Sequence, residues 1–161
     1  MDRGSNFTTY KQIFTYLQLP LTIIKDESLT SENDILIIKN LLKLVIAIKN
    51  DNYDQDFTYS FISVARSFLC QMSDAEIYEV ITNNTYKDTE LYKKCLALTD
   101  DLDVLAPNML YQKLLTTFNY EEHLLTTSAI STYLVREEYI YNLITDLSRD
   151  GNTIYDIVSS L

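Results

Sequence analysis

The chain has 161 residues, with 23 acidic and 13 basic side chains and a formal net charge of −10. This length fits one domain whose core needs no metal or disulfide to hold it together. The charge would repel a phosphate backbone, and no cluster of Lys or Arg offsets it, so we expect neither nucleic acid nor a membrane surface as a partner. Only two glycines and two prolines occur, which favours helices.

The amino-terminal segment predicts a short helix. Residues 1–5, MDRGS, read as a remnant of expression cloning, so we expect residues 6–161 to be a single all-α domain, a fragment of a longer protein. Pro20 ends a first helix over about residues 7–18, because its ring cannot continue a helix interior. The apolar positions that trace this helix are Phe7, Tyr10, Ile13, Phe14 and Leu17.

The stretch from Ser31 to Lys49 predicts the core helix. Apolar residues cover most of its circumference and leave a narrow polar stripe, so the helix must be buried. They are Ile35, Ile37, Ile38, Leu41, Leu42, Leu44, Val45, Ile46 and Ile48. Lys39 and Lys43 interrupt the apolar runs, which are therefore far shorter than the roughly 20 residues that a bilayer span needs. We therefore expect a soluble protein.

The middle of the chain predicts three more helices. Residues 55–72 carry apolar positions along one face of a second, mostly buried helix. Where it meets the core helix, we expect a core formed by Ile38, Leu42, Val45, Phe61, Val64 and Phe68. Ser73 and Glu76 have the spacing of a capping box, which starts a short helix at once. Asp88 is placed to cap another helix that reaches Leu98.

The remaining chain predicts three further helices. Pro107 suits the first turn of one helix, because its missing N–H would be unpaired there anyway. Asn119 opens a second helix from Tyr120 to about Val135, and a third spans residues 137–147. No run alternates like a half-buried strand for more than about four residues. The fold class expected is all-α, with about nine helices.

The last segment, residues 153–161, shows an apolar face that no other predicted element is expected to cover. A helix of about two turns is too short to be stable in water without packing. Its apolar positions are Ile154, Ile157, Val158 and Leu161. We expect this end to fray, or to form a weak homodimer through residues 140–161.

Two segments 63 positions apart resemble each other. Residues 77–83, IYEVITN, and 140–146, IYNLITD, share Ile, Tyr, Ile and Thr at identical places, although helices rich in these residues also match by chance. A unit of this length holds two helical hairpins. Residues 31–161 thus resemble the armadillo and HEAT class of helical-repeat proteins, without a diagnostic motif. The resemblance implies an α-solenoid-like stack of hairpins that acts as a protein scaffold.

A competing resemblance is to the compact Bcl-2-like helical bundle, in which amphipathic helices wrap one very apolar helix. Residues 31–49 are suited to that central position. The early place of this helix in the chain and the lack of an Asn-Trp-Gly-Arg motif count against it. The resemblance implies a viral-type regulator that binds an amphipathic helix of a host signalling or apoptosis protein.

Residues that carry chemistry are few. His123 is the only histidine and falls in the first turn of a predicted helix, so we expect a solvated residue and no catalytic triad. Cys70 and Cys95 lack the spacing of a zinc site and sit among apolar neighbours, which is typical of reduced, buried thiols. We expect no catalytic, metal or cofactor residues, and a non-enzymatic protein of the cytoplasm or nucleus.

Tyrosine is the one unusual quantity, with thirteen in the chain. Most fall on helix faces where core packing explains them, but tyrosine is also enriched in protein recognition surfaces. The candidate partner-binding residues are Tyr111, Tyr120, Tyr133 and Tyr139. The acidic balance predicts that the partner is another protein with a basic segment.

Overall fold

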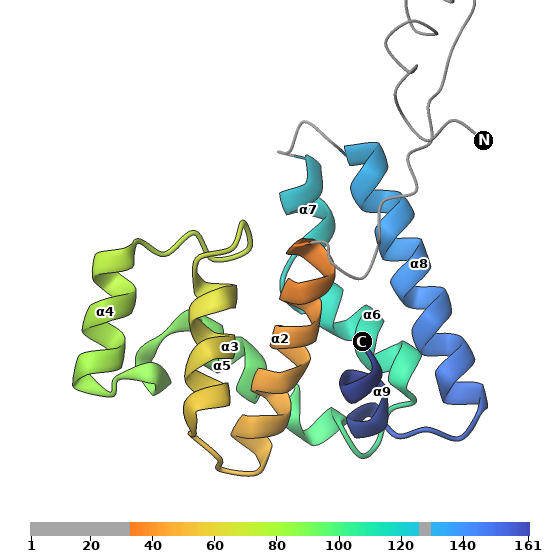
Figure 1. Cartoon of the computed structure of the whole chain (residues 1–161), viewed down its shortest axis with the longest axis horizontal. Helices are drawn as coiled ribbons and strands as arrows, with labels where there is room; N and C mark the ends of the chain where they lie inside the picture. The colour runs from red at the N-terminus through yellow and green to blue at the C-terminus, as the bar shows by residue number, and fades with distance from the viewer. Residues whose placement is uncertain (1–32, 126–129) are drawn as a thin grey trace, which may run out of the picture.

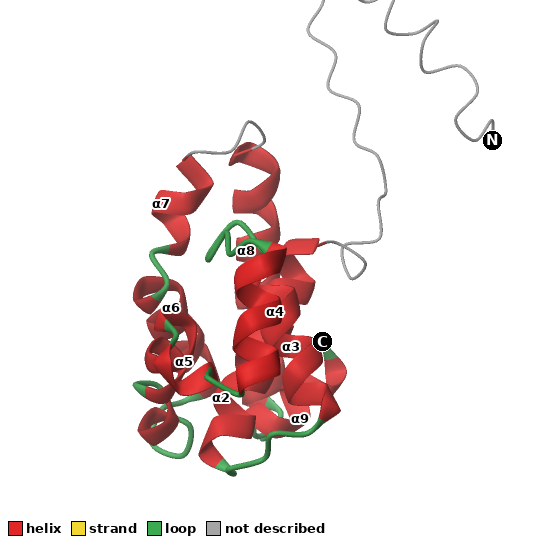
Figure 2. Cartoon of the chain, turned by 90° about the vertical axis from the view of Figure 1, so that its left-hand side faces the viewer, coloured by secondary structure: helices red, strands yellow, loops and turns green. Residues whose placement is uncertain are grey.

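The computed structural model describes residues 33–125 and 130–161; the predictions for the first helix and for residues 1–5 lie outside them. Within these two ranges the chain forms helices joined by turns and no strand (Figure 1, Figure 2). The prediction of an all-α fold is confirmed. Among these helices, none is both long and apolar enough to cross a membrane.

The described ranges contain eight α-helices and two short 3-10 helices. The α-helices are α2 (Asn33–Lys49), α3 (Gln55–Ala65), α4 (Asp74–Asn83), α5 (Glu90–Leu96), α6 (Pro107–Thr117), α7 (Tyr120–Leu125), α8 (Ile130–Arg149) and α9 (Ile154–Ser160). The 3-10 helices are η2 (Tyr86–Asp88) and η3 (Thr99–Asp101).

Helix α2 lies at the centre, as its apolar circumference predicts (Figure 1). Ile38, Leu41 and Leu42 have no solvent exposure. Helix α3 packs along α2, and α5, η3, α8 and α9 also contact it. The predicted core at the meeting of α2 and α3 is confirmed for Ile38, Leu42, Val45, Phe61 and Val64, which are all buried.

Phe68 is the exception in that predicted core, because α3 ends at Ala65 and not near Met72. The Ser67 hydroxyl donates to the Val64 carbonyl at 2.6 Å and accepts from the Leu69 N–H at 3.3 Å. Such local side-chain bonds compete with helical ones and favour a turn. Phe68 then lies half-buried in this turn.

Local capping explains where two helices begin. Ser73 Oγ accepts from the Glu76 N–H at 3.3 Å, and the Glu76 carboxylate accepts from the Ser73 N–H at 2.8 Å, so the predicted capping box is confirmed. The expected cap at Asp88 is wrong by one residue. Thr89 caps α5, because its hydroxyl accepts from the Tyr92 N–H at 3.2 Å.

The predicted boundary between two helices near residue 136 is wrong. Residues 130–149 form one helix of 20 residues, α8, while the preceding α7 ends at Leu125. Arg136, Glu137 and Glu138 are good helix formers, and no Gly, Pro or capping residue there interrupts the helix.

The described residues show no solenoid and no structural repeat. Residues 77–83 belong to α4, a short helix that packs on α3 at one side of the molecule (Figure 1). Their counterparts, residues 140–146, lie inside the long helix α8. Helices α3, α5, α8 and α9 pack around α2.

The apolar face of the last segment is covered within the chain, which corrects the prediction of an uncovered end. Ile154, Ile157 and Val158 are buried, and α9 contacts both α2 and α8. Thr153 and Asp156 form a capping box that starts the helix. Tertiary packing thus stabilises a helix too short to form alone, and the reason for a homodimer through residues 140–161 is removed.

We expect Leu42→Ala to lower the free energy of unfolding by about 2–5 kcal/mol, the range for truncation of a fully buried leucine. Leu36→Ala is the matched control, since Leu36 lies on the same helix with 39% of its surface exposed, and it should cost about 0.5 kcal/mol or less. Denaturant titration measures both. Equal losses would contradict the central position of α2.

A second pair of variants tests the packing of α9. Ile157→Ala should lower the free energy of unfolding by about 2–5 kcal/mol because Ile157 is fully buried. Tyr155→Ala on the exposed side should cost much less. If α9 were frayed, Ile157→Ala would leave the denaturation midpoint unchanged.

Candidate functional site

The four candidate tyrosines do not form one surface. Tyr111 on α6 and Tyr120 at the start of α7 are buried, with 0% and 1% of their surface exposed. Tyr139 on α8 is 36% exposed. Tyr133 belongs to α8, but its side chain lies outside the described residues. Core packing therefore accounts for Tyr111 and Tyr120. Leu110, Leu114 and Leu115 on α6 are buried as well.

Tyr111 and Tyr120 nevertheless adjoin a cleft between α6, α7 and α8. The cleft has two lobes of about 470 and 390 Å³ that share Gln112, Leu115, Glu121 and Glu137 in their walls. The remaining wall residues are Tyr111, Thr116, Asn119, Tyr120, Glu122, Glu138 and Tyr141. Volumes of this size are typical of ligand-binding clefts.

The junction between α6 and α7 shapes this cleft. Asn119 adopts a left-handed conformation with φ of 49°, which Asn tolerates better than most residues. Phe118 and Tyr120 on either side of it are each only 1% exposed. These two buried rings hold the reversal of the chain, so α7 begins at Tyr120 as predicted and its first turn brings Glu121 and Glu122 to the cleft.

The cleft is acidic. Glu121, Glu122, Glu137 and Glu138 contribute four carboxylates, and among the side chains that the structure describes neither Lys nor Arg lines either lobe. Burial and the nearby charge of Glu121 raise the pKa of Glu137. One Glu137 carboxylate oxygen, Oε2, is buried and has no hydrogen-bond partner among the described residues. These four carboxylates give the cleft a negative potential that a bound cation would relieve.

The other candidate residues behave differently from one another. His123 is half-buried against the Phe68 ring, with 6.4 Å between ring centroids, and is not the solvated residue expected. Cys70 and Cys95 are free thiols. Burial raises the pKa of Cys70 to about 11 and also raises that of Cys95. In the described ranges no group of three His, Cys, Asp or Glu side chains is placed to hold a metal ion.

The cleft is not predicted by the sequence alone. The Glu121-Glu122 and Glu137-Glu138 pairs are visible in the sequence, but two acidic pairs on separate helices usually indicate solvated faces. Only their placement across one cleft makes them a candidate site. Nothing in the sequence around either pair indicates that the two pairs lie across one cleft.

Comparisons of this chain with protein-family models, with characterised proteins and with solved structures find no match.

We expect Glu137→Gln to stabilise the fold at about pH 7.5 but not at about pH 4. The folded state raises the pKa of Glu137, so ionised Glu137 destabilises it. That penalty is absent below the unfolded pKa and complete above the folded pKa. Denaturant titration at both pH values measures the difference.

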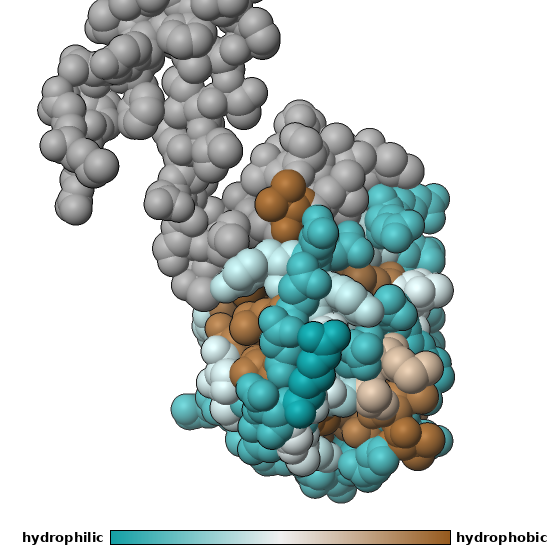
Figure 3. Space-filling view, turned by 90° about the vertical axis from the view of Figure 1, so that its right-hand side faces the viewer, coloured by the Kyte–Doolittle hydropathy of each residue, from teal (hydrophilic) through white to brown (hydrophobic). Residues whose placement is uncertain are grey.

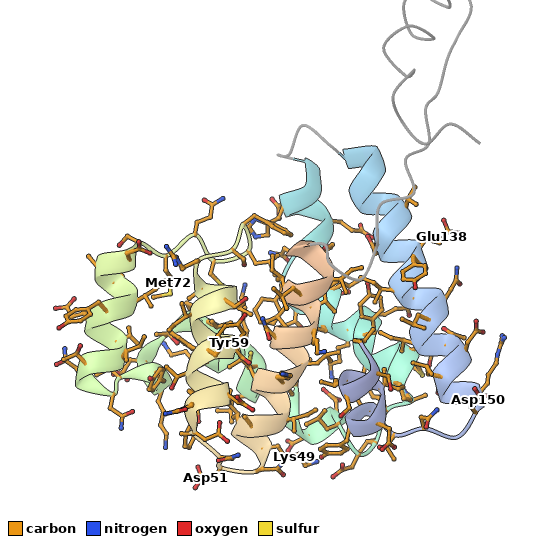
Figure 4. All side chains as sticks on the ribbon, in the orientation of Figure 1. Lys49, Asp51, Tyr59, Met72, Glu138 and Asp150 are labelled. Atoms are coloured by element: carbon orange, nitrogen blue, oxygen red, sulfur yellow. The ribbon has the colours of Figure 1, made fainter. Side chains whose placement is uncertain are left out.

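Glu138→Gln is the matched control, because this neighbouring residue of α8 also borders the cleft but is exposed (Figure 4). It removes the same charge from the same helix without relieving a buried carboxylate. A gain from Glu137→Gln that is equal at both pH values would contradict the pKa argument.

Proposed function

We propose that this chain is a non-enzymatic protein interaction domain whose acidic cleft binds a basic segment of another protein. The observation that carries the proposal is the cleft between α6, α7 and α8, whose described wall residues include four glutamates and no Lys or Arg. A Lys or Arg side chain is the complement of such a site.

The electrostatics of Glu121 and Glu137 support a cationic occupant. Their mutual repulsion helps to raise the pKa of Glu137 in the free protein. An ammonium or guanidinium group about 4 Å from one carboxylate gains about 1 kcal/mol in water and about 4 kcal/mol at the effective dielectric of a protein surface. A bound cation would therefore favour the ionised form of Glu137 and release its proton.

The whole-molecule charge acts in the same direction. A net charge of −10 attracts basic partners over the first Debye length, and the cleft then selects among them. Figure 3 views the molecule from the side of α8 and shows a surface that is mostly hydrophilic. Polar recognition therefore suits this face better than insertion of a large apolar surface.

A binding role suits the cleft better than catalysis. Two carboxylates with one raised pKa are also what general acid–base chemistry uses. Glu121, Glu122 and Glu138 are exposed, however, so water reaches the carboxylates and nothing isolates a reacting group. The free thiols Cys70 and Cys95 suit the cytoplasm or nucleus.

The central position of α2 favours one second candidate, the Bcl-2-like regulator that holds an amphipathic helix. One apolar helix surrounded by amphipathic ones is the arrangement that this resemblance implies. The solenoid scaffold remains a proposal whose support is the helix lengths and short loops alone. The acidic-cleft proposal and the Bcl-2-like candidate differ in the peptide that is bound: a basic segment in the first and an amphipathic helix in the second.

We expect a hexa-arginine peptide to bind the chain, measured by isothermal titration calorimetry. The double variant Glu121→Gln, Glu137→Gln should weaken binding about tenfold, because it removes both facing carboxylates. The matched control is Glu79→Gln, Asp88→Asn, which removes the same charge at exposed positions outside the cleft. It should change the affinity by about twofold or less.

Equal losses in the two double variants would mean that net charge alone attracts the peptide, and would overturn the cleft as the site. An uncharged amphipathic helical peptide tests the second candidate. If that peptide binds more tightly than hexa-arginine, the Bcl-2-like proposal replaces the acidic cleft.

A further inference from the structure

A second cavity lies between the turn after α3, helix α5 and the end of α6, and shares no residue with the acidic cleft. Its volume is about 320 Å³. The wall residues are Leu69, Cys70, Met72, Thr89, Glu90, Leu91, Lys94 and Phe118. Figure 4 labels Met72 beside the top of α4, in the chain that approaches this helix.

The interior of this cavity is apolar. Leu69, Leu91 and Phe118 are buried, and Cys70 and Met72 are half-buried beside them. Burial raises the pKa of the Cys70 thiol to about 11, so the thiol stays protonated and neutral at physiological pH. A pocket with such walls takes a hydrocarbon group and offers it no nucleophile.

Two of the polar side chains in the wall are already engaged. The Thr89 hydroxyl donates to the Tyr86 carbonyl at 2.7 Å and accepts from the Tyr92 N–H at 3.2 Å. The Glu90 carboxylate lies 3.4 Å from the Lys93 ammonium. Neither group is therefore free to select a ligand.

Lys94 is the remaining charged group. Its ammonium lies 5.4 Å from the centroid of the Phe118 ring, in a cation–π arrangement at the cavity wall. The same charge acts on the Cys70 thiol, where it opposes the effect of burial on the pKa. In the described part of the chain no carboxylate lies within ion-pair distance of Lys94, although the protein is strongly acidic.

We propose that this cavity binds a medium-chain fatty acid, with the hydrocarbon chain against Leu69, Leu91 and Phe118 and the carboxylate paired with Lys94. One apolar pocket with a single unpaired cation at its wall matches a molecule with one hydrocarbon chain and one negative charge. The proposal is independent of the acidic cleft.

Octanoate below its micellar concentration is the probe, and octanol is the uncharged probe of the same length. Titration followed by two-dimensional NMR measures affinity and location together. Octanoate should shift the signals of Leu91 and Phe118 and should bind about three- to tenfold more tightly than octanol, because only octanoate pairs with Lys94. This comparison needs no variant.

Lys94→Met keeps most of the aliphatic stem and removes the charge, so octanoate affinity should fall to that of octanol. Lys87→Met is the matched control, because Lys87 is exposed and does not line the cavity, and it should leave the affinity unchanged. Circular dichroism verifies that both variants fold.

Three results would overturn the proposal. They are no binding of octanoate, equal binding of octanoate and octanol, and shifts confined to residues outside the cavity. Tighter binding of N-acetyl-leucine than of octanoate would show that the cavity takes the carboxy terminus of a peptide, and would also reject the fatty-acid assignment.

Discussion

Burial of α2 is the constraint on which the other helices depend. A helix that is apolar on nearly all sides cannot remain in water, and each fully buried Ile or Leu contributes about 1.5–3 kcal/mol. Ile38, Leu41 and Leu42 reach complete burial only because α3, α5, α8 and α9 approach from different directions. The short α9 in turn depends on α2, since a helix of 7 residues is not stable alone.

One polar contact inside this apolar interface fixes how α3 meets α2. Asn40 is 1% exposed, and its side-chain amide donates to the Ser63 hydroxyl at 2.8 Å. A buried amide without a partner costs several times what an ordinary hydrogen bond contributes. Sliding α3 along α2 would break this bond, so the bond selects one register among several that apolar packing alone would allow.

The end of α6 connects the two sites. Phe118 lines the apolar cavity, and the next two residues, Asn119 and Tyr120, line the acidic cleft. The left-handed turn at Asn119 therefore separates an apolar wall from a carboxylate-lined wall within three residues. The core that buries Phe118 and Tyr120 holds both walls in place, although neither site shares a wall residue with the other.

The sequence by itself determined the helical class, the burial of α2 and the capping box at Ser73, because periodicity and capping are local properties of the chain. Tertiary structure alone decided which residues from different helices lie next to each other. It buried Tyr111 and Tyr120, covered the apolar face of α9, and brought Glu121 on α7 next to Glu137 on α8. No local pattern encodes such meetings, since they depend on how separate helices pack around α2. The similar segments 77–83 and 140–146 form a short outlying helix in α4 and part of a long helix in α8, because their packing partners differ.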